Sequence, residues 1–418
     1  MVIRQRWRNT ESCWTKNKMK KILIVIHDMK IGGAQKSLLS FLKCLMASQW
    51  GKEYEIHLML AYPHGEFLSQ IPQRVKLVAP SKPLYWMSSH VDADLLLKHF
   101  SWRGLYGEVC WILRKLLNLF PDGLNNSQKM WECWKNLIPE DSEQYDVAIS
   151  YIDGCTNYYL MEKVNAQKKV LWFHSEYQKH GYCPEYDSIF LEKCDCIVTV
   201  SDKCRTCLLE AFPHMDSKMH ILENITVYED LVARSGAAEC TEFADVSVLK
   251  LLTVGRLHPL KGIDLAVEAA KQLKSTGIPF CWLVVGDGPE REHIQRRIEA
   301  AGVSECFHLI GSRENPYPYM AQCDIVVQPS RVEGKSIVLD EAKMLLKPIV
   351  VTAYATVKDS VDHGNSGWIV EMTGQSICDG IVHLWQDKAL RSHISTYLQK
   401  LSKGNEEELN RYMEIMFR

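Results

Sequence analysis

Two glutamates, Glu333 and Glu341, flank the start of a predicted helix at residues 337–346. The apolar run 325–328 precedes them, so a strand leads through a loop into a helix. Backbone N–H groups at such a helix start, with Gly334 allowing close approach, can bind a phosphate. At ~1.5 Å per residue along a helix, the two glutamates lie about 10 Å apart. This span suits one carboxylate at a sugar and the other at a ribose, with a diphosphate between them.

The loop between the glutamates contains Gly334, Lys335 and Ser336, which we expect to line the same phosphate-binding site. This triplet imitates the end of the P-loop of nucleoside triphosphatases. That motif needs a glycine at the position where this chain has Pro329, so a P-loop is disfavoured. A single glutamate is usually a solvated surface charge, and the prediction therefore depends on the combination of these residues.

Two cations, Arg256 and Lys261, follow the predicted strand at residues 249–254. Doubly wound domains bind ligands at the carboxyl ends of their strands, and two cations there would neutralise a diphosphate. Solvated surface charges would give the same pattern, so for either residue taken alone that alternative stays open.

Another glycine, Gly286, follows the predicted strand 281–285 in a tight turn between strand and helix, and we assign it to the same ligand site. The turn is similar to the glycine-rich dinucleotide fingerprint, but Arg291 stands where that fingerprint has its third glycine. A nicotinamide or flavin enzyme is therefore disfavoured.

The first half of the chain has glycines and a histidine at comparable positions. Gly32 and Gly33 precede a predicted helix at residues 34–47 and would let a ligand approach the positive end of that helix. His174 ends the predicted strand 169–173, where its ring is suited to donating a hydrogen bond to a sugar hydroxyl. A lone histidine is more often structural, so both roles stay open for His174.

Short β-branched runs alternate with amphipathic helical stretches, which is typical of parallel sheets covered by helices on both faces. The fold class is therefore α/β, and 418 residues are enough for two domains with separate cores. We predict strands at residues 21–27, 54–61, 146–151, 169–173 and 197–200 in the first half, and at 249–254, 281–285, 307–310, 325–328 and 349–352 in the second.

The predicted elements also divide the chain into parts. The second half alternates regularly, as one doubly wound domain does, whereas a segment rich in Trp, Leu and Lys interrupts the first half. The helical tail could cap either domain. The parts are an extension outside the fold at 1–18, an amino-terminal domain at 19–230 with an insertion at about 84–141, a linker at 231–246, a carboxyl-terminal ligand-binding domain at 247–389 and carboxyl-terminal helices at 390–418.

The composition is that of a globular protein, with 46% hydrophobic and 24% charged residues. A net charge of −2 argues against nucleic acid as the main partner. We expect no membrane span, because no run of 18 apolar residues exists, and a cytoplasmic location, because the first twenty residues lack the apolar core of a signal peptide.

The chain has 15 cysteines, which in a cytoplasmic protein are expected to be reduced thiols. One cluster is faintly similar to a zinc site, but its members fall on a predicted strand and on the next helix, which favours small buried thiols. We expect no metal and no other cofactor. The cluster consists of Cys194, Cys196, Cys204 and Cys207.

Within the insertion, apolar residues recur at helical spacing in residues 105–120, beside the cations Arg114 and Lys115. Such a stripe could lie on an anionic membrane surface or could pack a helix on its own domain, and both interpretations stay open. Asp92 and Asp94 have the spacing of paired metal-binding carboxylates, but no apolar strand precedes them. We interpret this pair as a solvated helix start.

Taken together, the motifs resemble the family 4 retaining glycosyltransferases, which have the two-domain GT-B fold. The resemblance covers most of the chain and is strongest from residue 251 to about residue 370. It is weaker at residues 32–34, at His174 and at residues 200–202. The resemblance implies two doubly wound, Rossmann-like domains that face each other across a cleft, with a UDP-sugar favoured over a GDP-sugar as donor.

In this family the acceptor attacks the sugar from the face that the nucleotide leaves, and a donor phosphate oxygen helps to remove its proton. The two domains close for catalysis. The resemblance gives roles only to matching positions, which are Glu333 for the donor sugar, Glu341 for the ribose, Arg256 and Lys261 for the diphosphate, Gly33 for the cleft near the transferred sugar, and His174, which would face that sugar from the other domain.

Lys335 and Ser336 depart from the commoner family pattern, which has an aromatic residue followed by a small residue or proline. The variant resembles a subgroup of bacterial surface-polysaccharide assembly enzymes, whose acceptors are usually lipid-linked saccharides at the cytoplasmic membrane face. This resemblance gives more weight to peripheral membrane contact through residues 105–120. A nucleotide-sugar epimerase of the same fold and a non-catalytic binding protein of the glycan pathway remain alternatives.

Overall fold

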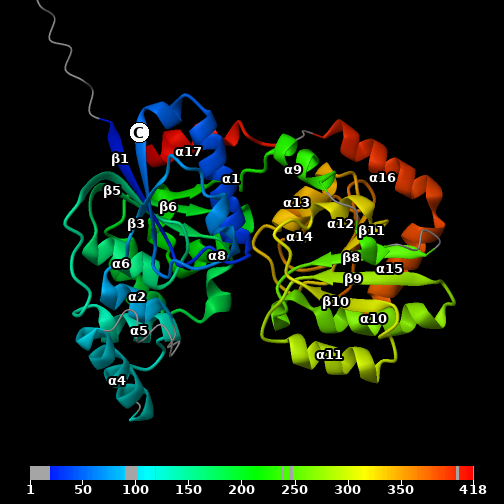
Figure 1. The fold of residues 1–418 in the computed structure, drawn as a ribbon, viewed down its shortest axis with the longest axis horizontal. Helices are drawn as coiled ribbons and strands as arrows, with labels where there is room; N and C mark the ends of the chain where they lie inside the picture. The colour runs from blue at the N-terminus through cyan, green and yellow to red at the C-terminus, as the bar shows by residue number, and fades with distance from the viewer. Residues whose placement is uncertain are drawn as a thin grey trace, which may run out of the picture.

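In the computed structural model the chain forms two α/β domains that lie side by side (Figure 1). The structure describes residues 19–89, 101–117, 119–237, 240–243, 248–401 and 404–417. The predicted extension at 1–18 and the pair Asp92 and Asp94 lie outside the described residues. The α/β class and the division into two doubly wound domains are confirmed.

The amino-terminal domain is built on a seven-stranded parallel sheet with the order β3-β2-β1-β4-β5-β6-β7. Residues 22–26 of its first strand are fully buried because helices cover both faces of the sheet. The two strands that were not predicted, β3 and β7, have three residues each and lie at the sheet edges, with Leu77 of β3 60% exposed. The strands are β1 (Lys20–Ile26), β2 (Tyr54–Leu60), β3 (Lys76–Val78), β4 (Gln144–Ser150), β5 (Asn165–Phe173), β6 (Cys196–Thr199) and β7 (Met219–Ile221).

The helices of this domain cover its two sheet faces with separate apolar cores. Alternate residues of β1 enter opposite cores, so that Ile24 packs with Phe41 of α1 while Val25 packs with Trp131 of α5. The helices are α1 (Gly33–Ala47), α2 (Lys82–Ser89), α4 (Trp102–Leu116), α5 (Asn126–Trp134), α6 (Cys155–Lys163), α7 (Pro184–Leu191) and α8 (Asp202–Ala211).

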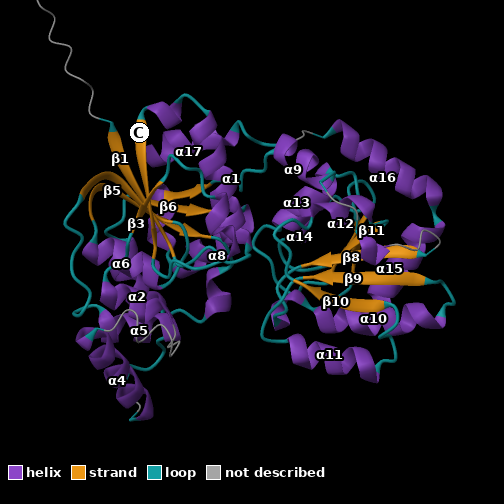
Figure 2. Ribbon diagram, in the orientation of Figure 1, coloured by secondary structure: helices purple, strands orange, loops and turns teal. Residues whose placement is uncertain are grey.

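The carboxyl-terminal domain has a six-stranded parallel sheet with the order β10-β9-β8-β11-β12-β13. Figure 2 shows its strands between two layers of helices, with α10 and α11 on one side and α12, α13 and α14 on the other. Its strands are β8 (Leu249–Val254), β9 (Phe280–Val285), β10 (Phe307–Gly311), β11 (Ile325–Gln328), β12 (Ile349–Thr352) and β13 (Trp368–Val370), and its helices are α10 (Ile263–Ser275), α11 (Arg291–Ala300), α12 (Tyr317–Gln322), α13 (Ile337–Met344), α14 (Val357–Ser360), α15 (Gly374–Gln386) and α16 (Lys388–Lys400).

The predicted carboxyl-terminal helices at 390–418 are divided between the two domains (Figure 1). Helix α16 packs on the carboxyl-terminal core through Ile394 and Leu398. Helix α17 (Glu408–Phe417) instead enters the amino-terminal core, where the Tyr412 ring lies 5.1 Å from the ring of Phe41. The helical tail, which by sequence could cap either domain, packs on both, because its two helices bury their apolar faces in different cores.

The chain crosses between the domains twice, and the two crossings are hydrogen-bonded to each other. The backbone N–H of Thr226 donates to Oδ1 of Asn405 at 2.8 Å, and the N–H of Asn405 donates to the Thr226 carbonyl at 3.4 Å. The predicted linker at 231–246 follows the first of these crossings. Its described residues are partly helical, since α9 (Tyr228–Ser235) extends into it and packs against α12. Among the described helices, none is long and apolar enough to cross a membrane.

Candidate donor site

The sheet order of the carboxyl-terminal domain places two loops next to each other at the carboxyl ends of β8 and β11. Connections from β8 proceed to one side of the sheet and those from β11 to the other, so the crevice between these strands is the usual ligand position in such a sheet. Gly262 packs the loops together: it has a φ of 62°, and a Cβ there would lie 2.0 Å from the Pro329 carbonyl oxygen. The predicted residues Arg256, Lys261 and Glu333 belong to these two loops.

Glu333 is held by a set of donors around its carboxylate. Nζ of Lys261 lies 2.6 Å from Oε1 and 2.7 Å from Oε2. Gln328 donates through Nε2 at 2.9 Å, and the Ser330 hydroxyl donates at 2.7 Å. The carboxylate therefore has a fixed orientation before any ligand binds.

Gln328 and Ser330 were missed in the sequence analysis as residues that position Glu333. A signal for them was present, since Gln328 is a polar residue at the end of an otherwise apolar strand and Ser330 follows that strand by two residues. Thr352 at the end of the neighbouring β12 donates to the Ser330 carbonyl at 2.5 Å. These polar strand ends form a rigid base under the Glu333 loop.

Arg256 differs from the other arginine of the two loops, Arg331. Within the described part of the chain, the exposed guanidinium of Arg256 forms no hydrogen bond or ion pair. Arg331 is bound to Asp264 in bidentate geometry, with N–O distances of 2.8 and 2.7 Å. The pKa of His258 is lowered mainly by burial of its ring and, to a smaller extent, by the positive charge of Arg256. Arg256 is thus a cation available to an anionic ligand, whereas Arg331 is committed to the protein.

Lys335 and Ser336 were predicted to contact the ligand, but in the structure both side chains make protein contacts. Ser336 is buried at the start of α13 and donates to Oε1 of Gln328 at 2.8 Å. Lys335 forms an ion pair with Glu223 of the amino-terminal domain at 2.6 Å. The sequence could not indicate this pair, because Glu223 is brought to Lys335 only by the packing of the two domains.

Glu341 lies at the domain interface and is 1% exposed. Its Oε1 accepts a hydrogen bond from the Tyr317 hydroxyl at 2.9 Å and lies 2.5 Å from Nζ of Lys36 on α1. Its other oxygen, Oε2, is buried without a hydrogen-bond partner among the described residues. Lys36 and Tyr317 were not predicted. The interface therefore places a buried carboxylate, with one oxygen still able to accept, between the two domains.

The glycines of both domains meet at this interface. A Cβ on Gly334 would lie 2.3 Å from the His174 carbonyl oxygen, so only glycine fits there without displacing backbone. A Cβ on Gly33 would lie 4.0 Å from Ile337, which places the start of α1 opposite the start of α13. At Gly32 a Cβ would meet only the flexible side chain of Gln35.

Gly286 has a packing role at the end of β9. Its φ is +154°, and a Cβ would lie 1.9 Å from the Gly255 carbonyl oxygen. Its N–H donates to the Gly311 carbonyl at 3.0 Å. The glycine therefore holds the ends of β8, β9 and β10 together, and its predicted contact with a ligand remains a prediction.

His174 directly follows β5 and is positioned by Tyr151, which directly follows β4, and by Trp172 on β5. Its Nε2 lies 2.9 Å from the Tyr151 carbonyl oxygen, which can only accept, so Nε2 carries the proton. Its ring stacks on Trp172, with a centroid distance of 5.7 Å. Burial lowers the pKa of His174 to about 4. The expectation of a donated hydrogen bond is corrected: the neutral ring presents Nδ1, which accepts.

The cysteine cluster is a set of free thiols in the apolar interior. Burial raises the pKa of Cys194 and of Cys196 to about 12, so both remain protonated at neutral pH. Among the described residues, no group of three or more His, Cys, Asp or Glu side chains is placed to hold a metal ion.

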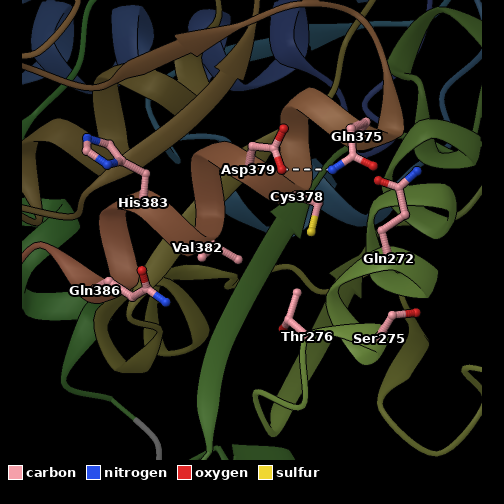
Figure 3. Close-up of a pocket in the computed structure, with 9 residues that line it drawn as sticks. All are labelled: Gln272, Ser275, Thr276, Gln375, Cys378, Asp379, Val382, His383 and Gln386. Atoms are coloured by element: carbon pink, nitrogen blue, oxygen red, sulfur yellow. Dashed lines mark hydrogen bonds between the residues drawn. The ribbon is translucent and has the colours of Figure 1, made fainter.

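A separate pocket of about 530 Å³ lies between α10 and α15 (Figure 3). Its lining includes Gln272, Gln375, Asp379 and His383, and Gln375 donates to Asp379 at 2.8 Å. None of its lining residues is a lysine or an arginine. It is therefore poorly suited to a diphosphate, unlike the crevice at β8 and β11.

Comparison with known proteins finds similarity to the carboxyl-terminal domain by sequence and to the whole chain by fold. Residues 244–401, which span the carboxyl-terminal domain, match the family model of glycosyl transferases group 1. The solved structure of Anabaena Alr3699/HepE in complex with UDP and glucose superposes with a TM-score of 0.67 at 15% identity, covering 94% of this chain and 98% of that one. The chain has the GT-B fold and resembles the group 1 glycosyl transferases. The resemblance predicted from the motifs is thereby confirmed.

Curated relatives of this group include two from bacterial polysaccharide pathways. The putative colanic acid biosynthesis glycosyltransferase WcaL of Salmonella typhimurium is 26% identical over 200 residues, which are 44% of this chain and 49% of WcaL. The amylovoran biosynthesis glycosyltransferase AmsK of Erwinia amylovora is 28% identical over 150 residues, 34% of this chain and 37% of AmsK. The chain thus matches half or less of the length of these relatives.

Proposed function

We propose that this GT-B chain is a retaining glycosyltransferase of polysaccharide biosynthesis, which moves a hexosyl-type sugar from a nucleotide-diphosphate donor to a saccharide or lipid-linked saccharide. The observation that carries the proposal is the meeting of Arg256, Lys261 and Glu333 in the crevice between β8 and β11. A UDP-sugar is favoured, because structures of the Anabaena protein contain UDP and UDP-glucose. WcaL and AmsK support a polysaccharide pathway.

In this proposal the exposed guanidinium of Arg256 and the ammonium of Lys261 bind the diphosphate. Glu333, whose carboxylate is fixed by Gln328 and Ser330, accepts hydrogen bonds from donor-sugar hydroxyls. Glu341 accepts from the ribose hydroxyls through its unpartnered Oε2.

Transfer breaks the bond between the anomeric carbon and the donor phosphate oxygen. The acceptor hydroxyl oxygen bonds to that carbon on the same face, and its proton passes to the departing phosphate, which leaves as nucleoside diphosphate. Arg256 and Lys261 stabilise the charge that develops on the leaving group. His174 faces the sugar from the amino-terminal domain and orients a hydroxyl by accepting through Nδ1.

These two cations supply positive charge where other transferases use a divalent ion, so we propose that the reaction needs no metal. Transfer should then continue at an unchanged rate after prolonged dialysis against EDTA. Recovery of a lost rate by added Mg²⁺ or Mn²⁺ would contradict this part of the proposal.

The deciding experiment is a screen of nucleotide sugars with purified protein and a lipid extract as acceptor source. We expect nucleoside diphosphate release that depends on acceptor, and a product whose anomeric configuration by NMR is that of the donor. Conversion of the donor sugar without acceptor would instead indicate an epimerase. Donor binding without any turnover, and an unchanged cellular glycan in Glu333→Ala cells, would indicate a binding protein.

A further inference from the structure

Helix α4 in the amino-terminal domain exposes nearly all of its large apolar side chains. Trp102 and Leu116, at its two ends, are each 76% exposed. Isolated exposed apolar residues are normal, but a contiguous group on one helix marks an interaction surface. The α4 face, as we call this group, consists of Trp102, Leu105, Tyr106, Val109, Ile112, Leu113 and Leu116.

The opposite side of α4 explains why these residues point outward. Gly104 and Gly107 are its buried residues, and they pack on the rings of Trp86 and Trp134. A Cβ on Gly104 would lie 2.4 Å from the Trp86 ring, and a Cβ on Gly107 would lie 2.8 Å from the Trp134 ring. Close ring packing at two glycines one turn apart fixes the rotation of the helix about its axis. The helix therefore does not pack on its own domain through the apolar stripe, as one of the two interpretations required.

Helical spacing makes the outward residues one continuous stripe. Trp102, Tyr106, Val109, Leu113 and Leu116 follow each other at intervals of three or four residues, which places them on one side of a helix with about 3.6 residues per turn. Figure 1 shows α4 projecting from the amino-terminal domain beyond α2 and α5, away from the carboxyl-terminal domain. Val109, Leu113 and Leu116 of this stripe are 44%, 50% and 76% exposed.

Basic residues border the α4 face on both sides. At about 100° per residue, Arg103 and Arg114 fall on one flank and Lys115 on the other, and all three are exposed. The one acidic residue of the helix, Glu108, is half-buried, and burial raises its pKa. Positive flanks around an apolar stripe are complementary to a surface with anionic headgroups above acyl chains.

We infer that the α4 face binds the surface of an anionic lipid bilayer. The leucines, Ile112 and Val109 enter the boundary of headgroups and acyl chains, while Trp102 and Tyr106 lie at headgroup level, where amphipathic rings are favoured. Arg103, Arg114 and Lys115 contact lipid phosphates. This surface acts independently of glycosyl transfer. If the proposed function holds, it keeps the acceptor-side domain at the membrane that carries a lipid-linked acceptor.

The test is co-sedimentation of the full chain with vesicles of phosphatidylcholine containing phosphatidylglycerol, compared with phosphatidylcholine alone. We expect binding to the mixed vesicles, and a loss of about tenfold or more in partitioning for the double variant Leu113→Glu and Leu116→Glu. Ile189→Glu is the matched control, since Ile189 is 51% exposed on α7 and lies outside the stripe. The control should bind as the unchanged protein does.

Two further measurements keep the inference falsifiable. The unfolding temperature and the UDP affinity of the double variant should equal those of the unchanged protein. This result would show that both domains are folded, and it does not depend on sugar transfer. Equal binding of the double variant and the unchanged protein would overturn the inference. The inference would also be overturned if the unchanged protein were a dimer without lipid affinity and the double variant a monomer. In that case a second copy of the chain would cover the stripe.

Discussion

Nζ of Lys36 in the amino-terminal domain and Oε1 of Glu341 in the carboxyl-terminal domain lie 2.5 Å apart, which makes them an ion pair across the domain interface. The pair is largely buried, with side-chain exposures of 20% and 1%. The Lys36 ammonium also lies 4.6 Å from the centre of the Tyr317 ring. Since Lys36 holds Oε1 and leaves Oε2 for the proposed ribose contact, we expect Lys36 to orient the Glu341 carboxylate for the nucleotide.

Replacement of Lys36 by Met should therefore weaken UDP binding, by roughly fivefold or more, because the Glu341 carboxylate loses the cation that fixes its orientation. Isothermal titration calorimetry measures this. Lys43→Met is the matched control on the same helix, since Lys43 pairs with Asp230 and not with Glu341. Unchanged or tighter binding in Lys36→Met would contradict this positioning role of Lys36.

Glu333→Gln should lower the rate of transfer on the order of a hundredfold or more, with little change in UDP affinity. The amide keeps the shape of the carboxylate but is uncharged. It therefore accepts hydrogen bonds from sugar hydroxyls less strongly and forms no ion pair with Lys261. Steady-state kinetics and calorimetry separate the two effects. A full rate in this variant would remove Glu333 from the proposed site. Glu292→Gln, at an exposed position of α11, is the control and should leave both quantities unchanged.

The two arginines of the crevice should respond differently to replacement by Ala. Arg256→Ala should weaken UDP binding by about tenfold to a hundredfold without changing the unfolding temperature, because its guanidinium makes no protein contact within the described residues. Arg331→Ala should mainly lower stability, by about 1 to 2 kcal/mol, because it breaks the bidentate pair with Asp264. Calorimetry and thermal unfolding on both variants test this contrast, and an exchange of the two effects would contradict it.

His174 should make the free energy of unfolding depend on pH. Its pKa is lowered to about 4 in the folded chain, below the value of about 6.5 for an unfolded histidine, so the unfolded state binds the proton more readily. The contribution of the neutral ring is fully present above about pH 6.5 and is lost as the pH falls toward 4, by up to about 3 kcal/mol.

Urea unfolding of the unchanged protein and of His174→Gln at pH 7.5 and at pH 5 measures this contribution. The amide of Gln can still donate to the Tyr151 carbonyl but does not titrate. The stability difference between the two proteins should therefore shrink at pH 5. A difference that stays constant would show that the His174 ring is already exposed to protons in the folded state.

The sequence alone determined the strands that are buried on both faces. Predicted and observed bounds coincide for β8, β11 and β12, since each is a short apolar run between polar loops. The same patterns placed Arg256, Lys261 and Glu333 at strand ends, and parallel strands in one sheet bring their carboxyl ends to one edge. These features are local, so periodicity and motif spacing are enough to find them.

The tertiary structure alone decided which residues meet across the two domains. Nothing local to Lys36 indicates Glu341, and nothing local to Lys335 indicates Glu223, because these pairs form only when the domains pack. The same holds for α17, whose apolar residues fit either core by their spacing and enter the amino-terminal one. The orientation of α4 was likewise decided by the tertiary structure. The helical period predicts its apolar stripe, but not the direction in which the stripe faces. Gly104 and Gly107 pack on tryptophan rings, because a helix packs most closely where it has no side chains, and the stripe on the opposite side therefore faces outward.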